Sequence, residues 1–229
     1  MGMPLYFVFG LPALLLALYA QWRVTSTYRK YLQVPSSAQM TGAQVAQFLL
    51  RSTGLSLRIE GVAGQLTDHY DPRNNVLRLS AGVAQSSSVG AVAVVAHELG
   101  HALQDEQNFA LLRLRSGMVP VVNFTSWLGP IIFLVGMLFQ SQQLATVGVF
   151  FVAGAVVFSL LTLPVELDAS RRAMQLLQQS GILADETSLR GAREMLSAAA
   201  LTYVAALAQA ISTMLYYIFL LSGNRRRRI

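Results

Sequence analysis

The sequence predicts an α+β membrane protein in which a small polar unit is joined to a bundle of transmembrane helices. Of the 229 residues, 54% are hydrophobic and only 12% are charged, about half the charged share of a typical soluble domain. Four long apolar segments alternate with regions whose periodicities are those of helices and strands in water. Cysteine is absent, which excludes disulfides and cysteine-based zinc sites, so any metal must be held by His, Asp or Glu.

The first apolar segment, residues 3–22, predicts a membrane anchor. It carries no charge and is about as long as a bilayer-spanning helix must be. No basic residue precedes it, as one would in a secretory signal, so we expect the anchor to be retained. Arg23, Arg29 and Lys30 follow it directly, and positive charge favours the cytoplasmic side. The N-terminus is therefore expected outside, with the following region in the cytoplasm.

Residues 23–123 form the polar region and predict a small mixed fold. Within it, "TGAQVAQFLLRSTG" reads as a helix, because Thr41 and Gln44 have capping-box spacing and Gly54 is a helix stop. "LSLRIEGV" alternates as a strand does. "QLTDHYDPRNNVLRLSAG" predicts two strands around an Asp-Pro-Arg-Asn-Asn turn. Ser86 to Ser88 then precede a helix that they can cap.

Residues 124–164 predict a transmembrane hairpin, since two apolar runs are joined by the short polar link "QSQQ". Amphipathic helices are expected over 165–198. The apolar segment 199–221 either spans the membrane or lies in it as a re-entrant helix, and the basic tail 222–229 follows.

The basic surplus favours a membrane surface over nucleic acid as the partner. The net charge is +6, and four of its positive charges stand together at 225–228. Anionic head groups attract such a tail by about 1 kcal/mol per Arg. No aromatic residues interleave with a basic stripe, as a nucleic-acid-binding face requires. The other 13 basic residues all fall on the side of residues 23–123, which supports a cytoplasmic polar unit. The side of the tail stays open.

The stretch "AVVAHELGHALQ", residues 93–104, contains the motif with the clearest chemistry. His97 and His101 are four residues apart, so on a helix they project from one face, one turn apart. Two imidazoles placed in this way can share one Zn²⁺ ion. Glu98 points about 100° away from His97, which suits a general base rather than a third ligand. Gly100 would let another backbone approach closely. The alternative is a partly buried histidine pair without a metal.

A catalytic zinc usually has three protein ligands, and two candidates remain for the third. His69, in "LTDHYDP", is expected at the edge of a strand hairpin. Glu166, in "LPVELDASRRA", follows the transmembrane hairpin, which returns it to the side of His97. A carboxylate at that position could also simply favour a helix start. Spacing alone does not choose between them.

Five motifs together resemble one bacterial family of membrane zinc proteases. "TGAQVAQFLL", "LTDHYDP", "VVAHELGHALQ", "LPVELDASRRA" and "RGAREMLSAAALTYVAALA" occur in order over nearly the whole chain. They are similar to the neutral zinc metallopeptidases of the YugP type. The resemblance implies a multi-pass protease of the bacterial inner membrane that binds one Zn²⁺. It implies His97, His101 and Glu166 as ligands and Glu98 as the catalytic base.

The layout also resembles HtpX-type proteases, which place a membrane hairpin between the two ligand motifs. Those have an Asp four residues after the ligand Glu, where this chain has Ser170, with Asp168 at two. The residue that orients the ligand histidines therefore stays open. In similar peptidases a His or Tyr stabilises the oxyanion, a role that His69 or Tyr70 could fill. Both could equally be ordinary strand residues.

We therefore expect a zincin-like (gluzincin) unit that cuts peptide bonds with a metal-activated water and Glu98 as base. A site-2-type intramembrane protease fits less well, because only about seven apolar residues precede His97, too few to span. The second alternative is a non-catalytic, zinc-stabilised membrane scaffold or adaptor. The expected partners are the lipid bilayer and a peptide or membrane-protein substrate.

Overall fold

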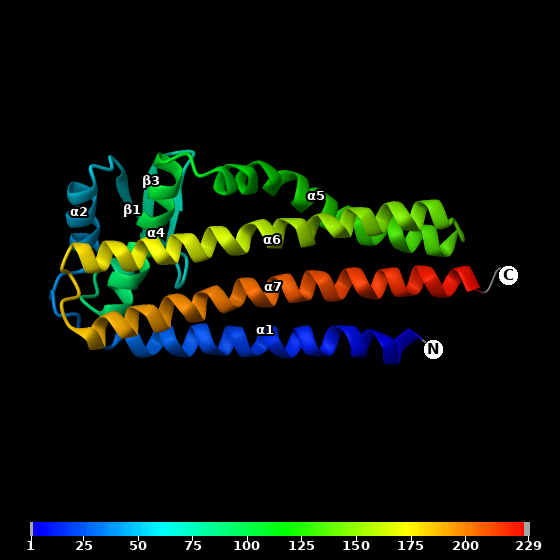
Figure 1. The fold of residues 1–229 in the computed structure, drawn as a ribbon, viewed down its shortest axis with the longest axis horizontal. Coiled ribbons are helices and arrows are strands. Elements are labelled where there is room, and N and C mark those ends of the chain that lie inside the picture. Colours follow the sequence, from blue (N-terminus) through cyan, green and yellow to red (C-terminus); the bar gives the residue numbers. More distant parts are fainter. Residues whose placement is uncertain (1, 227–229) are drawn as a thin grey trace. The chain divides into compact units, whose positions relative to one another are not determined.

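The computed structural model describes residues 2–226, with side chains from 7 to 223, so part of the basic tail, 227–229, lies outside the described residues. The chain is mostly helical with one small sheet (Figure 1). It divides into two compact units. The membrane unit comprises residues 1–21, 113–164 and 202–229, and the polar unit comprises residues 22–112 and 165–201.

Four long helices contribute to both units. They are α1 (Gly2–Leu32), α5 (Ala110–Leu138), α6 (Gln142–Gln179) and α7 (Glu186–Arg226). Within the described residues, each contains a stretch long and apolar enough to cross a membrane. The apolar segment 199–221 thus lies inside one continuous helix. The region 165–198, which was expected to form amphipathic helices, contains the end of α6 and the start of α7. Its helical parts therefore continue the long apolar helices.

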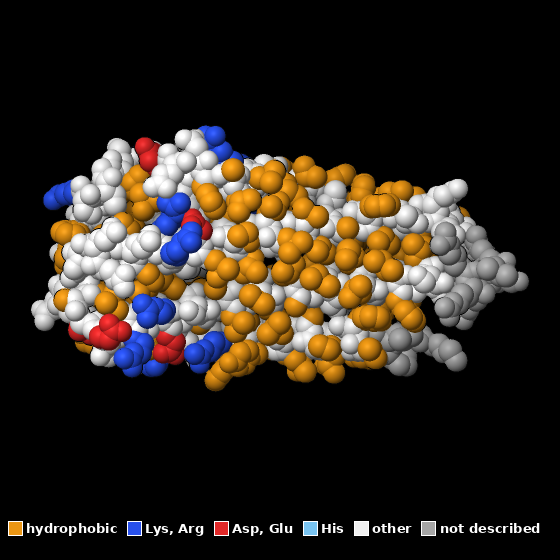
Figure 2. Space-filling model, viewed as in Figure 1, with side chains coloured by type: hydrophobic (Ala, Val, Ile, Leu, Met, Phe, Trp, Pro, Cys, Tyr) orange, Lys and Arg blue, Asp and Glu red, His pale blue; other side chains and the backbone are white. Residues whose placement is uncertain are grey.

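Close backbone packing holds the α5–α6 hairpin of the membrane unit together. A Cβ added to Gly136 would lie 2.3 Å from the Ala145 nitrogen, and one added to Gly148 would lie 2.5 Å from the Phe133 nitrogen. Small residues at such positions let membrane helices approach closely. Large apolar side chains face outward instead: Trp127 and Phe150, for example, are 67% and 72% exposed. Figure 2 shows hydrophobic side chains over most of the visible face of this unit, as contact with lipid requires.

In the polar unit, α2 (Gly42–Thr53) confirms the predicted helix and both of its ends. The Thr41 hydroxyl accepts a hydrogen bond from the Gln44 backbone, and the Gln44 side chain accepts one from the Thr41 backbone. Gly54 ends the helix with φ of 74°, a left-handed conformation that glycine adopts without strain. Val45 and Leu49 are completely buried and form the apolar stripe of the helix.

The sheet has three strands: β1 (Arg58–Val62), β2 (His69–Asp71) and β3 (Val76–Ser80), in the order β1-β3-β2. The predicted hairpin is confirmed, because β2 pairs antiparallel with β3 and Tyr70 lies opposite Leu77. β1 pairs parallel with β3. The central strand β3 is the most buried, with Val76 and Leu77 fully inside the core.

After the short helix α3 (Ala81–Ala84), α4 (Val89–Glu106) passes through the core of the polar unit. Ser88 caps α4, as predicted, because its side chain accepts a hydrogen bond from the Ala91 backbone. Val92, Val95 and Leu99 of α4 are fully buried. This packing fixes the rotation of α4 about its axis, and so the direction in which its polar residues point.

Candidate metal centre

The two histidines of the motif lie on one face of α4. The ring centroids of His97 and His101 are 4.9 Å apart, and the rings are nearly perpendicular. The backbone of α4 is held by buried neighbours on its opposite side, so the direction of both imidazoles is set before any metal binds.

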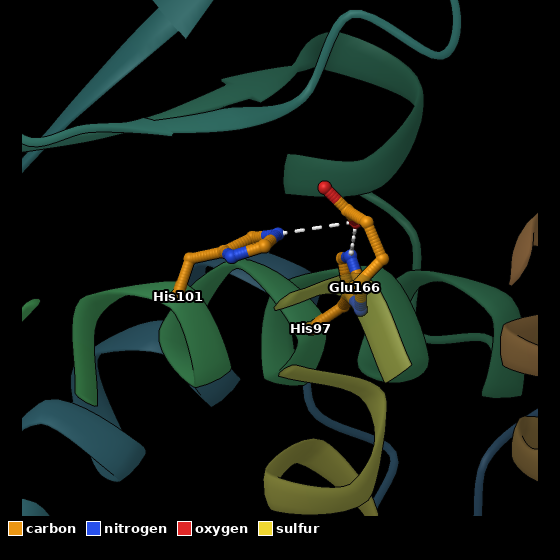
Figure 3. A group of neighbouring side chains, drawn as sticks. All are labelled: His97, His101 and Glu166. Atoms are coloured by element: carbon orange, nitrogen blue, oxygen red, sulfur yellow. Dashed lines mark ion pairs between the residues drawn. The ribbon is translucent and has the colours of Figure 1, made fainter. Parts of the chain in front are cut away.

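Glu166 reaches the same point from α6 (Figure 3). Its Oε2 atom lies 3.4 Å from the Nε2 atoms of both His97 and His101, and its side chain is only 2% exposed. Within the described residues, these three side chains form a group that could hold a metal ion. Glu166, rather than His69, is thus the third residue that the fold brings to the histidine pair.

The spacing of the three side chains fits a tetrahedral zinc site. Zinc bonds to nitrogen and oxygen of about 2.1 Å place tetrahedral ligands about 3.4 Å from one another. Both nitrogen–oxygen separations in the structure have that value. Two imidazoles and a carboxylate are also a donor set that zinc accepts in catalytic sites with one open position.

Gly100 allows α6 to come close enough for Glu166 to reach the histidines. A Cβ added to Gly100 would lie 2.5 Å from the backbone oxygen of Ala169 and 3.1 Å from its carbonyl carbon. Real side chains do not pack at such a distance from a backbone oxygen. The expected close approach at Gly100 is therefore confirmed, and the approaching backbone lies three residues after Glu166.

The structure gives each histidine a partner for its second ring nitrogen. His97 Nδ1 lies 3.3 Å from the hydroxyl oxygen of Ser170, the residue at the position of the HtpX-type Asp. His101 Nδ1 lies 3.0 Å from Gln104 Oε1. Among the described residues, the hydrogen bonds that Asp168 accepts come from Gln104 and two arginines, not from a histidine. Gln104 was not predicted from the sequence, although it follows His101 by one helical turn.

Glu98 lies beside these three residues, and its carboxylate is held by strand β2. Its Oε2 accepts a hydrogen bond of 2.9 Å from the Tyr70 backbone nitrogen in β2. Burial raises the pKa of the Glu98 carboxyl, and the nearby His97 and His101 oppose that rise. A carboxyl with a raised pKa is a better proton acceptor than an ordinary one and holds the accepted proton longer. For His101, burial lowers the pKa, but the hydrogen bond that its protonated ring donates to Glu166 and the negative charge of Glu98 outweigh burial and leave the pKa raised.

His69 and the Tyr70 hydroxyl are engaged elsewhere. His69 is exposed; its Nδ1 lies 2.8 Å from the Thr67 backbone oxygen, and its Nε2 lies 3.4 Å from Arg78. The Tyr70 hydroxyl donates to Asp105 at 2.9 Å. Burial, followed by the bond to Asp105, raises the pKa of Tyr70. The backbone of Tyr70, and not its ring, is what contacts the site.

Comparisons with known proteins agree with this geometry. Residues 6–222 match the family described as "Putative neutral zinc metallopeptidase". The chain is 41% identical over 222 residues to the "Putative membrane protease YugP" of Bacillus subtilis (strain 168), covering 96% of this chain and 98% of that relative. No solved structure matches the chain. With the family matched over nearly its whole length, the chain belongs to the neutral zinc metallopeptidases of the YugP type.

Proposed function

We propose that this protein is a membrane-embedded zinc endopeptidase, with a zincin-like polar unit that carries the active site. The observation that supports this best is the convergence of His97, His101 and Glu166 at separations of 3.4 Å. Membership of a zinc metallopeptidase family supports the same conclusion. The four apolar helices support a place in a lipid bilayer.

His97 and His101 would bind one zinc ion through their Nε2 atoms, and Glu166 would bind it through Oε2. When bound, zinc would lower the pKa of water to about 7 and would polarise the scissile carbonyl. The burial of Glu166 keeps bulk water from competing for its carboxylate. The Ser170 and Gln104 contacts hold the two rings in place.

Glu98 would act as the general base. The Tyr70 backbone holds Oε2 of Glu98, which leaves Oε1 to take a proton from the attacking water. The carboxyl would hold that proton until the peptide C–N bond breaks. The proton then passes to the leaving amine, which departs as a neutral group.

We further propose that the substrates are polypeptide segments near a membrane surface, with the polar unit in the cytoplasm of a bacterial cell. The basic residues that follow the first anchor support this orientation.

Glu98→Gln tests the proposal. This variant keeps the shape of the side chain but cannot accept a proton as a carboxylate does. Peptidase activity in detergent or liposomes should fall by several orders of magnitude, while zinc content stays at the wild-type level. Glu106→Gln is the matched control, because Glu106 ends the same helix and is exposed. Unchanged activity in Glu98→Gln would defeat the proposal, and a scaffold would be indifferent to either change.

A further inference from the structure

Gln104 is a buried polar residue that the proposed hydrolysis does not use. It lies on α4, and its side chain is 0% exposed. A buried amide must find partners for both of its N–H groups and for its oxygen. Here Nε2 donates to the Val165 backbone oxygen at 2.8 Å and to Asp168 Oδ2 at 2.9 Å. Oε1 lies 3.0 Å from Nδ1 of His101.

The partners of Nε2 determine the orientation of this amide. A carbonyl oxygen and a carboxylate oxygen can only accept hydrogen bonds. If the amide were reversed, its own oxygen would face both of them at less than 3 Å. The Gln104 oxygen must therefore face His101.

The orientation of the amide in turn determines the tautomer of His101. Because Gln104 Oε1 can only accept, Nδ1 of His101 must carry the hydrogen. In the neutral ring the lone pair is then on Nε2, the atom that lies 3.4 Å from Glu166 Oε2. His97 has no comparable constraint, since the Ser170 hydroxyl beside it can either donate or accept.

The same side chain also reaches the backbone that carries Glu166. Val165 directly precedes Glu166, and both belong to α6. Asp168, the second acceptor, is itself held by Arg172, whose Nε donates to it at 2.6 Å. Arg172 also donates to Gln107, which caps α4, at 2.6 Å. Gln104 is thus the buried centre of a network that joins the two ligand-bearing helices.

We propose that Gln104 is a positioning residue of the metal site, which fixes the Nδ1-protonated tautomer of His101 and holds the backbone before Glu166 in place. This inference rests on the proposed function only in taking His101 as a zinc ligand. A residue that acts on a ligand in this way typically changes metal affinity by about 10–100-fold when it is lost.

Gln104→Met tests the inference, because methionine fills a similar volume without the amide. We expect its zinc dissociation constant, measured by competition with a chelating dye, to rise by about 10–100-fold. Gln47→Met is the control, since Gln47 is exposed on α2. In zinc-free protein labelled with ¹⁵N-histidine, at a pH high enough to make the His101 ring neutral, NMR should show one Nδ1-protonated tautomer for His101 in the wild type and a mixture in Gln104→Met. A folded variant with wild-type affinity and a single tautomer would overturn the inference.

A second pair of variants tests the same inference if Gln104→Met does not fold. Gln104→Glu preserves an acceptor for His101 but sets a carboxylate against both Asp168 and the Val165 backbone oxygen. Adding Asp168→Asn restores a donor at one of these two positions, so zinc affinity in the double variant should recover in part, by about tenfold, relative to Gln104→Glu alone. No recovery would contradict the proposed network. The tautomer measurement uses zinc-free protein, so it still tests Gln104 if the peptidase proposal fails.

Discussion

Gly100→Ala should weaken zinc binding by moving α6, although Gly100 is not itself one of the three proposed ligands. The added Cβ would lie 2.5 Å from the Ala169 backbone oxygen. An ordinary contact begins near 3.4 Å and a tight one near 3.0 Å, so the two helices must separate locally by about 0.5–0.9 Å in a close-packed interior. The neighbour is backbone of α6, which cannot rotate away as a side chain could.

That displacement is large relative to the tolerance of a metal site. Ligand distances in real sites stay within about 0.2 Å of their preferred values. Glu166 lies three residues before Ala169 on the same rigid helix and would move with it. We therefore expect zinc affinity to fall at least about tenfold, which corresponds to about 1.4 kcal/mol. Overpacking should also reduce the free energy of unfolding by about 1–3 kcal/mol.

The assay is zinc titration of purified protein in detergent against a competing chelator, with circular dichroism to verify the fold. Gly82→Ala is the matched control, because a Cβ at this helical glycine of the polar unit would meet nothing within 4 Å. Wild-type zinc affinity in a folded Gly100→Ala variant would show that the close packing of α6 on α4 does not determine the position of Glu166.

Three further predictions concern the hairpin of β2 and β3. His69→Ala should keep one zinc per chain by elemental analysis, because His69 is exposed and outside the ligand group. Loss of zinc in this variant would instead indicate that His69 is a ligand. Tyr70→Phe should keep kcat within about tenfold of wild type, since its hydroxyl is committed to Asp105 and not to an oxyanion; loss of an oxyanion donor would cost about 100-fold or more. Hydrogen bonds from Asn74 and Arg78 lower the pKa of Asp71. Its stabilising contribution is therefore complete above the unfolded-state pKa of about 3.9, declines below that pH, and is lost as the pH falls through the lower folded-state pKa. Asp71→Asn should therefore lower Tm most at pH 7 and by a smaller amount as the pH falls below about 3.9, and a loss of Tm that does not shrink with falling pH would contradict this.

Features with local causes could be predicted from the sequence. The ends of α2 follow from Thr41, Gln44 and Gly54, which act within four residues of one another. The hairpin of β2 and β3 follows from its turn residues, and the common face of His97 and His101 follows from helix periodicity. Each depends on chain neighbours, whose geometry is nearly independent of the rest of the fold.

Features that depend on distant contacts could not be predicted in the same way. β1 and β3 pair in parallel, which no turn between them dictates. The choice of Glu166 over His69 depends on how α6 packs on Gly100. The sequence also places a compositional boundary at Pro164, yet α6 continues through it. Neighbouring helices can satisfy the backbone group that proline leaves free in a membrane.

The role of Gln104 was hidden for a related reason. Its spacing from His101 is visible in the sequence, but glutamine near a helix end is usually a surface residue. Only the packing of α6 onto α4 buries it and supplies Val165 and Asp168 as partners.

Elemental analysis of purified wild-type protein beside His97→Ala and Glu166→Ala tests the central claim most directly. The account predicts one zinc per chain in the wild type and a large loss of zinc in both variants. A wild-type protein that takes up no zinc when it is supplied, or a Glu166→Ala variant that retains the full amount, would contradict it.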